Sequence, residues 1–243
     1  MATLDGVWRV SRVLSTGSTN ADVAAAARAG EPEGHVLVAD EQTAGRGRLG
    51  RPWSSPPGSS LSVSVLLRPS GPPITSWSWL PLLAGVAAVE AVRDAASVEA
   101  VLKWPNDVQR DGRKLAGILV ERADTPTGAA AVVGIGMNIT AAPVDAASLA
   151  DTDATRDGVL DALLARLAAW YQCWLSAPHG LELPEAYRLA CGTLGQQVRV
   201  ELPGGATVAG RATVIDADGR LVLSTSGGER AIGAGDVVHL RPE

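Results

Sequence analysis

The stretch that decides the fold class is HVLVADEQTAGRGRLGRPWSSPPGSSLSVSVLLR, residues 35–68. Its first part, HVLVADEQT, is typical of a buried strand. Its last part, LSVSVLLR, places Leu61, Val63, Val65 and Leu67 on one face and serines on the other, which is the two-residue period of a strand. The glycines, arginines and prolines in between predict a loop. The segment therefore predicts strand, loop, strand.

The loop contains Gly45, Gly47 and Gly50 at the G-x-G-x-x-G spacing of dinucleotide-binding turns. That fold needs a helix to open at the third glycine, whereas prolines and a further strand follow here. We therefore interpret the loop as a flexible backbone that can approach a ligand closely, with three arginines suited to an anion. A plain solvated loop would not explain three arginines brought together against their mutual repulsion.

The helix and strand patterns in the rest of the chain predict a mixed α+β protein with a largely antiparallel sheet flanked by helices. Helices are expected at about 20–29, 77–92, 158–175 and 184–190, the second with Pro81 in its first turn. Strands at 101–104, 114–123 and 129–139 suggest an antiparallel meander.

From Gly195 onward the chain changes character. Five short strands separated by glycine-rich turns indicate a small barrel of SH3-like size. We therefore expect two domains, 1–192 and 193–243, that pack against each other.

Composition narrows the class of protein. A hydrophobic fraction of 46% with 19% charged residues is typical of a soluble enzyme-sized protein, and a net charge of -5 argues against a nucleic-acid partner. The start lacks a secretory signal and no run approaches about 18 apolar residues, so we expect a cytoplasmic protein without a membrane partner. The two cysteines and three histidines are too scattered to predict a zinc site or a disulfide scaffold.

Lysine is rare: the chain has two, Lys103 and Lys114, against nineteen arginines. Both lie in KWPNDVQRDGRKLAG, residues 103–117. Because an ammonium is a compact point charge and a guanidinium is a planar fork, this pairing suggests a site that needs an ammonium. Chance or a helix-end charge is the alternative.

Five segments together resemble the biotin protein ligases: STN (18–20), EQTAGRGRLGRPW (41–53), KWPNDV (103–108), GRKLAGILVE (112–121) and GIGMN (134–138). The resemblance covers nearly the whole chain. It implies a fold related to class II aminoacyl-tRNA synthetases with an SH3-like C-terminal domain. It also implies a two-step reaction, in which biotin is activated with ATP and Mg²⁺ to biotinyl-5'-AMP and then transferred to a lysine of a biotin carboxyl carrier protein.

The resemblance assigns roles residue by residue. The catalytic positions are Arg48 and Lys114. The positions that bind biotin are Ser18, Thr19, Asn20, Gln42, Arg46, Gly47 and Gly117. The positions that bind the nucleotide are Arg51, Trp53, Lys103, Asn106, Asp107 and Asn138, and no dedicated metal site is implied.

Three alternative functions are a lipoate- or octanoate-attaching enzyme, a biotin-binding regulator and a DNA-binding repressor. Enzymes that attach lipoate or octanoate share the fold, but they resemble RRxSGGGAVxH in the loop where this chain has GRGRLGR. A non-catalytic biotin-binding regulator would not require phosphate-neutralising groups. A DNA-binding repressor is not expected, because seventeen residues precede Ser18 and a winged helix needs about 50 or more.

We predict that Lys114→Arg folds normally yet loses adenylation activity on the order of a hundredfold or more. Charge is kept, but a planar guanidinium cannot place one compact charge between a carboxylate and a phosphate oxygen. Biotin-dependent pyrophosphate release and the melting temperature would be measured together. Wild-type turnover in a well-folded variant would refute the need for an ammonium.

Overall fold

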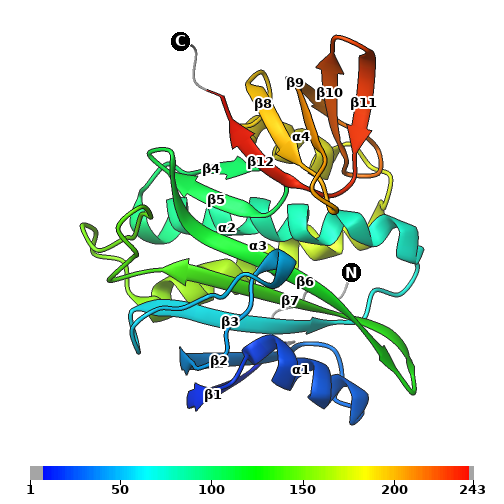
Figure 1. The fold of residues 1–243 in the computed structure, drawn as a ribbon. Helices are drawn as coiled ribbons and strands as arrows, with labels where there is room; N and C mark the ends of the chain where they lie inside the picture. Colours follow the sequence, from blue (N-terminus) through cyan, green and yellow to red (C-terminus); the bar gives the residue numbers. More distant parts are fainter. Residues whose placement is uncertain (1–7, 241–243) are drawn as a thin grey trace.

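The computed structural model describes residues 8–240, which form two sheets (Figure 1). Residues 1–7 and 241–243, the outer ends of the two predicted domains, lie outside the described part. The large sheet has the order β1-β2-β3-β7-β6-β5-β4, and the C-terminal sheet has the order β11-β10-β9-β8-β12. Every neighbouring pair is antiparallel except β1 and β2. The expectation of a mixed, largely antiparallel α+β fold is confirmed.

The strands of the large sheet are β1 (Arg9–Thr16), β2 (His35–Gln42), β3 (Ser60–Leu67), β4 (Val101–Lys103), β5 (Asp107–Arg110), β6 (Arg113–Thr125) and β7 (Gly128–Asn138). Those of the C-terminal sheet are β8 (Gln197–Glu201), β9 (Thr207–Ile215), β10 (Leu221–Thr225), β11 (Gly228–Ile232) and β12 (Asp236–His239).

Two strands were missed by the sequence analysis, for a shared physical reason. β1 is exposed along nearly its whole length, so it carries no buried apolar face that a pattern could reveal. β5 has four residues, of which only Val108 is fully buried. Both are defined by the backbone pairing that the neighbouring strand offers, since β1 pairs with β2 and β5 with β6.

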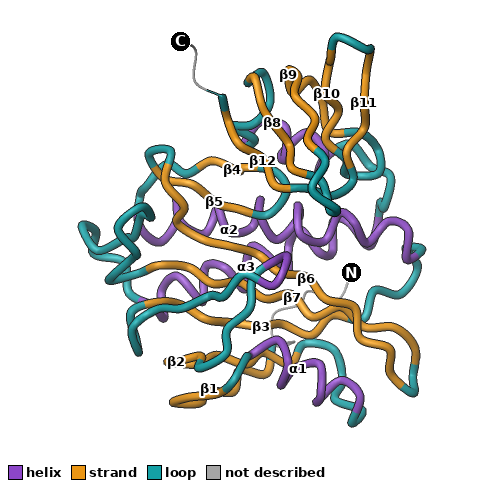
Figure 2. Tube along the Cα trace, viewed as in Figure 1, coloured by secondary structure: helices purple, strands orange, loops and turns teal. Residues whose placement is uncertain are grey.

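The helices are α1 (Thr19–Arg28), α2 (Leu80–Ala96), α3 (Arg156–Ser176) and α4 (Glu182–Ala190), with 3-10 turns η1 (Arg48–Gly50) and η2 (Ile74–Trp79). The predicted helices are present, and Pro81 lies in the first turn of α2 as expected. The predicted start at Trp77 was wrong, because 74–79 form the separate turn η2. α2 and α3 run alongside each other over one face of the large sheet (Figure 2).

The apolar and serine residues that alternate along β3 lie on two faces of the strand, and both faces are buried. Leu61, Val63, Val65 and Leu67 belong to the main core under α2 and α3. The serine face is buried too, because α1 covers it and packs there with Leu66 in a second, smaller cluster. The serines are thus enclosed polar groups that need partners.

One expectation about apolar segments needs correction. The helical segment Ile74–Ala96 is long and apolar enough to span a membrane by length and composition, with mean hydropathy 1.2 over eighteen residues. Of that window, 56% is buried inside the protein. The segment is explained by its place against the sheet and α3, as a core helix.

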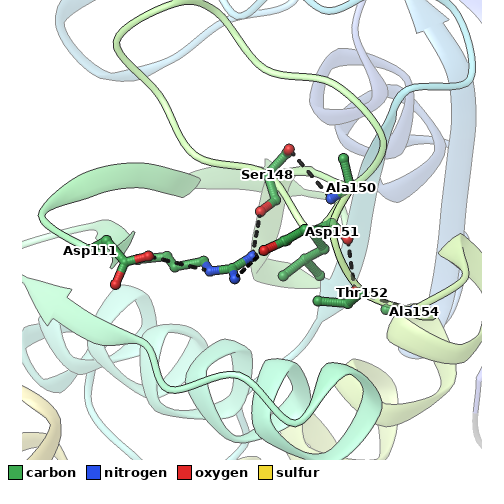
Figure 3. Close-up of polar contacts among 8 residues, drawn as sticks. Asp111, Ser148, Ala150, Asp151, Thr152 and Ala154 are labelled. Carbon is green, nitrogen blue, oxygen red and sulfur yellow. Dashed lines mark hydrogen bonds and ion pairs between the residues drawn. The ribbon is translucent and has the colours of Figure 1, made fainter.

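The connection between β7 and α3 is tied to the β5–β6 hairpin. Arg110 donates two hydrogen bonds to the Asp151 carboxylate, at 2.6 and 2.7 Å, and a third to the Ser148 carbonyl at 3.0 Å. Figure 3 shows Asp151 and Ser148 together on this connection. Hydrogen bonding to Arg110 lowers the pKa of Asp151. These hydrogen bonds therefore fix the β5–β6 hairpin to the connection between β7 and α3.

The C-terminal sheet closes over the β4–β5 end of the large sheet (Figure 1). Trp104, which is 1% exposed, donates from Nε1 to the Gly219 carbonyl at 3.1 Å and from its backbone nitrogen to Thr193 Oγ1 at 3.1 Å. Trp79 Nε1 likewise donates to the Ala217 carbonyl at 2.8 Å. The expected packing of the two parts is confirmed, and their cores are continuous.

Removing residues 193–243 should destabilise the remaining chain. Full exposure of a tryptophan such as Trp104 forfeits about 4–6 kcal/mol of burial, at 150–250 Å² per aromatic side chain and about 25 cal/mol per Å². Guanidinium unfolding of the full chain and of residues 1–192, followed by circular dichroism, measures this. An unchanged midpoint would contradict the prediction.

Candidate active site

A cavity of about 160 Å³ opens between the start of α1, the 45–53 loop and the strands β6 and β7. All but two of the predicted site residues line it: Ser18, Thr19, Asn20, Gln42, Arg46, Gly47, Arg48, Arg51, Trp53, Asn106, Asp107, Lys114 and Gly117. The two exceptions are Lys103 and Asn138. The fold thus brings together residues that are nearly 100 positions apart in the sequence.

One end of the cavity carries a network of mainly neutral polar groups. Thr19 donates to Gln42 Oε1 from its backbone nitrogen at 2.8 Å and from its hydroxyl at 3.0 Å. Ser64, on the enclosed face of β3, donates to Asn20 Oδ1 at 2.6 Å. Asn20 Nδ2 in turn donates to Glu121 Oε2 at 2.7 Å. The buried serine face of β3 therefore serves this site.

Ser18 occupies the N-cap position of α1. Within the described residues its side chain makes no capping hydrogen bond. The residue is buried and lines the cavity, so its hydroxyl is available to a ligand.

Two paired glycines form a floor under Trp53. Gly117 of β6 and Gly136 of β7 lie opposite each other in the sheet. A Cβ on Gly136 would lie 2.4 Å from Trp53 Cε2, and one on Gly117 would lie 3.0 Å from Lys114 Nζ. Only residues without a side chain permit this approach of the indole to the sheet. Trp53 Nε1 is buried there and has no hydrogen-bond partner among residues 8–240.

Arg48 and Lys114 are each held by a neighbour from the 103–108 segment. Arg48 Nη1 donates to Asn106 Oδ1 at 2.9 Å, and Asn106 Nδ2 donates to the Ile118 carbonyl at 3.1 Å. Burial lowers the pKa of Arg48, although Asp107 and Asp236 oppose this effect. Lys114 Nζ lies 2.7 Å from Asp107 Oδ1, close enough for an ion pair but not aligned as a hydrogen bond.

The remaining loop arginines have carboxylate partners. Arg51 Nη2 donates to Asp236 Oδ2 at 2.5 Å, and this hydrogen bond raises the pKa of Arg51. Arg46 Nη2 lies 3.6 Å from Glu121 Oε1. Every cation of the cavity is therefore oriented by a hydrogen bond or an ion pair.

The two predicted residues outside the lining have other surroundings. Lys103, on β4, acts electrostatically on Asp236 and His239 of the C-terminal sheet. Asn138 is 2% exposed and donates to the Ala147 carbonyl at 2.9 Å, which anchors the connection after β7. Their predicted nucleotide contacts stay predictions.

Sequence reasoning missed several lining residues. Gly134 and Gly136 lay within the GIGMN segment but were assigned no role, and a pair of glycines two positions apart in a buried strand was an available signal. Gly235 and Asp236 come from the C-terminal sheet. Nothing in the local sequence marks them, because their place in the site depends on how the sheet docks.

The cavity can hold a molecule with two unlike ends. Its neutral end offers amide and hydroxyl groups that pair an uncharged polar ring. Its other end carries three cations, Arg48, Arg51 and Lys114, beside two lining carboxylates, so it favours anions. Apolar side chains, including Val63 and Ile135, also line the cavity.

Comparison with protein-family models identifies two regions. Residues 15–138 match the family described as "Biotin/lipoate A/B protein ligase family", and residues 193–240 match "Biotin protein ligase C terminal domain". Together they cover the large sheet from the end of β1 onward and the whole C-terminal sheet.

Individual known proteins with similar sequences or folds are also ligases. The chain is 44% identical to the biotin-acetyl-CoA-carboxylase ligase of Mycobacterium tuberculosis, over 96% of this chain and 90% of that protein. It is 36% identical to the bifunctional ligase/repressor BirA of Bacillus subtilis, over 85% of this chain and 66% of that protein. Its fold is similar to a biotin protein ligase from Aquifex aeolicus in complex with biotin and ATP, with a TM-score of 0.79, 27% identity, and coverage of 96% and 99% of the two chains.

The neutral network yields a stability prediction. A Cβ on Gly134 would lie 2.1 Å from Asn20 Oδ1, so Gly134→Ala must push Asn20 out of its hydrogen bonds. We expect a loss of about 1–3 kcal/mol in the free energy of unfolding. The measurement is urea unfolding.

A matched control is Gly227→Ala, in the β10–β11 turn, where the nearest atom to a new Cβ lies at 3.8 Å and the backbone needs no positive φ. We expect a change there within about 0.5 kcal/mol. Equal effects of the two substitutions would show that Asn20 is not packed against Gly134.

Proposed function

The chain belongs to the biotin/lipoate A/B protein ligase family, and we propose that it is a biotin protein ligase. It activates biotin with ATP to biotinyl-5'-AMP and transfers the biotinyl group to a lysine of a biotin carboxyl carrier protein. The observation that carries the proposal is that one cavity has both a neutral polar end and a cationic end. Biotin itself has this division, with a neutral ureido ring and a carboxylate.

The neutral end binds the ureido ring. The ring presents one carbonyl and two N–H groups, and each group left unpaired in a buried site costs roughly 1–3 kcal/mol. Ser18, Thr19, Asn20 and Gln42 supply hydroxyl and amide groups that donate and accept. The valeryl chain then runs past the apolar lining, and its carboxylate reaches the cationic end.

Adenylation takes place at the cationic end. A carboxylate oxygen of biotin attacks the α-phosphorus of ATP, a P–O bond forms, and the bond to pyrophosphate breaks. Because the two reactants carry like charge, fixed cations must bring them together and stabilise the charge that develops. Arg48 and Lys114 do so, Arg48 being held in place by Asn106.

Transfer follows in the same cavity. The uncharged amine of the carrier lysine attacks the carbonyl carbon of biotinyl-5'-AMP, an amide bond forms, and AMP leaves with the bonding electron pair. The amine proton passes to solvent or to the departing phosphate. The cations now stabilise the negative charge on AMP.

Asp107 fits a role toward Mg²⁺ that enters with ATP. Its Oδ1 atom is buried in the cavity without an aligned hydrogen bond. A single carboxylate suits Mg²⁺, which takes its other oxygen ligands from phosphates and water. When bound, the ion shields the charge of the leaving pyrophosphate.

Two observations favour biotin over lipoate or octanoate. The family model for residues 15–138 covers both classes, but the model for residues 193–240 is that of biotin protein ligases. The loop GRGRLGR lacks the RRxSGGGAVxH pattern of lipoate enzymes. The cations of the cavity also favour an enzyme over a binding regulator, which needs no groups to neutralise phosphate.

We further propose that the C-terminal sheet is an SH3-like barrel and that the large domain is related to class II aminoacyl-tRNA synthetases. The five short antiparallel strands of the C-terminal sheet support the first statement. The large, mainly antiparallel sheet with helices on its faces supports the second.

We also propose that the protein acts in the cytoplasm, where the carrier protein and ATP meet.

The test is pyrophosphate release from ATP with biotin, lipoate or octanoate offered separately. Release with biotin alone supports the proposal. Release with lipoate or octanoate in preference to biotin would assign the chain to the other branch, and none with any of the three would overturn an enzymatic role.

Trp53→Ala should weaken binding of a stable biotinyl-adenylate analogue more than binding of biotin. Stacking of the indole on a base contributes about 1–3 kcal/mol, whereas the biotin carboxylate and ring have other partners. Calorimetry with both ligands measures the difference. Equal losses for the two would remove the stacking role.

A further inference from the structure

A single side-chain hydrogen bond joins the loop 45–53 to the C-terminal sheet within the described residues 8–240. Arg51 Nη2 donates to Asp236 Oδ2 at 2.5 Å, across 185 positions of sequence. Both residues line the cavity. Asp236 therefore brings a carboxylate of the C-terminal sheet into the candidate active site, next to Gly235, which also lines the cavity.

Asp236 is held in a fixed position by its own sheet. It is the first residue of β12 and pairs with Glu201 of β8. A Cβ on the preceding Gly235 would lie 2.5 Å from Val200 Cγ1, so the backbone at this point is packed tightly against β8. The carboxylate is thus presented from a rigid strand.

Three cations act electrostatically on this carboxylate. Burial alone would raise the pKa of Asp236, but Arg51, together with Lys103 and Arg48, lowers it. The three cations come from two different segments, the 45–53 loop and β4.

Within residues 8–240, the guanidinium of Arg51 has no side-chain hydrogen bond other than the one to Asp236. The turn of the loop is closed by backbone contacts alone, from Gly47 N to the Arg51 carbonyl at 2.7 Å and from Arg51 N to the Arg48 carbonyl at 3.2 Å. The Arg51 side chain is 61% exposed. Because its contact with Asp236 uses one nitrogen, Nε and Nη1 remain able to donate to a phosphate.

We propose that Asp236 is a positioning residue for the first step, which orients Arg51 toward the nucleotide phosphates. The inference rests on the proposed function and extends it. Fixing a flexible arginine before the ligand arrives lowers the entropy lost on binding, and the remaining donors then meet the phosphate in a set direction.

The test is a double-mutant cycle with Asp236→Asn, Arg51→Gln and the combined variant, assayed by biotin-dependent pyrophosphate release. We expect Asp236→Asn to raise KM for ATP about tenfold, because one charge-assisted hydrogen bond no longer orients Arg51. The dissociation constant for biotin and the melting temperature should stay at their wild-type values. The combined variant should be no worse than Arg51→Gln, since Asp236 acts through Arg51.

The control is Glu185→Gln, which removes a carboxylate from the exposed ion pair with Arg188 on α4, at 2.7 Å, away from the cavity. It should leave KM for ATP unchanged. A purely structural effect of Asp236→Asn would lower the melting temperature and add to the Arg51 substitution.

Three results would overturn the inference while the wild-type protein releases pyrophosphate: an unchanged KM for ATP in Asp236→Asn, additive effects in the cycle, or a lowered KM. The last would mean that Asp236 competes with phosphate for Arg51. Absence of release from the wild type would instead overturn the proposed function.

Discussion

Repulsion between like charges is the constraint on which the rest of this structure depends. A site that joins a carboxylate to a polyphosphate must hold several cations close together, and these cations repel one another before any ligand arrives. The fold meets the requirement by giving each cation a separate partner: Asn106 for Arg48, Asp107 for Lys114 and Asp236 for Arg51. The partners fix the direction of each charge, and a ligand then completes the neutralisation.

The three partners come from elements with different supports. Asn106 and Asp107 lie at the start of the β5–β6 hairpin, which Arg110 ties to the connection after β7. Asp236 comes from the C-terminal sheet, whose docking on the large domain depends on the hydrogen bonds of Trp104 and Trp79. The C-terminal sheet therefore contributes to the site as well as to stability.

Neutral and apolar groups have an equally specific place. The serines of β3 lie on the strand face opposite its main core residues, yet this face is buried too and Ser64 donates a hydrogen bond to Asn20. The glycines of β6 and β7 leave room for Trp53 to lie against the sheet. In both cases small residues leave room for a binding surface where larger side chains would fill the core. Hydrophobic periodicity alone does not reveal this role.

The sequence by itself determined the order of most strands and helices, the loop with its arginines, and most of the residues that line the cavity. It could do so because buried strands, helix turns and glycine-rich loops leave local patterns, and because the motifs that carry the resemblance are continuous segments. β1 and β5 left no such pattern, since pairing with a neighbour defines them. Tertiary structure alone placed Asp236 beside Arg51, kept Lys103 and Asn138 out of the cavity lining, and enclosed the serine face of β3. The physical reason is that contacts between distant segments depend on how sheets and helices dock, which no local pattern encodes.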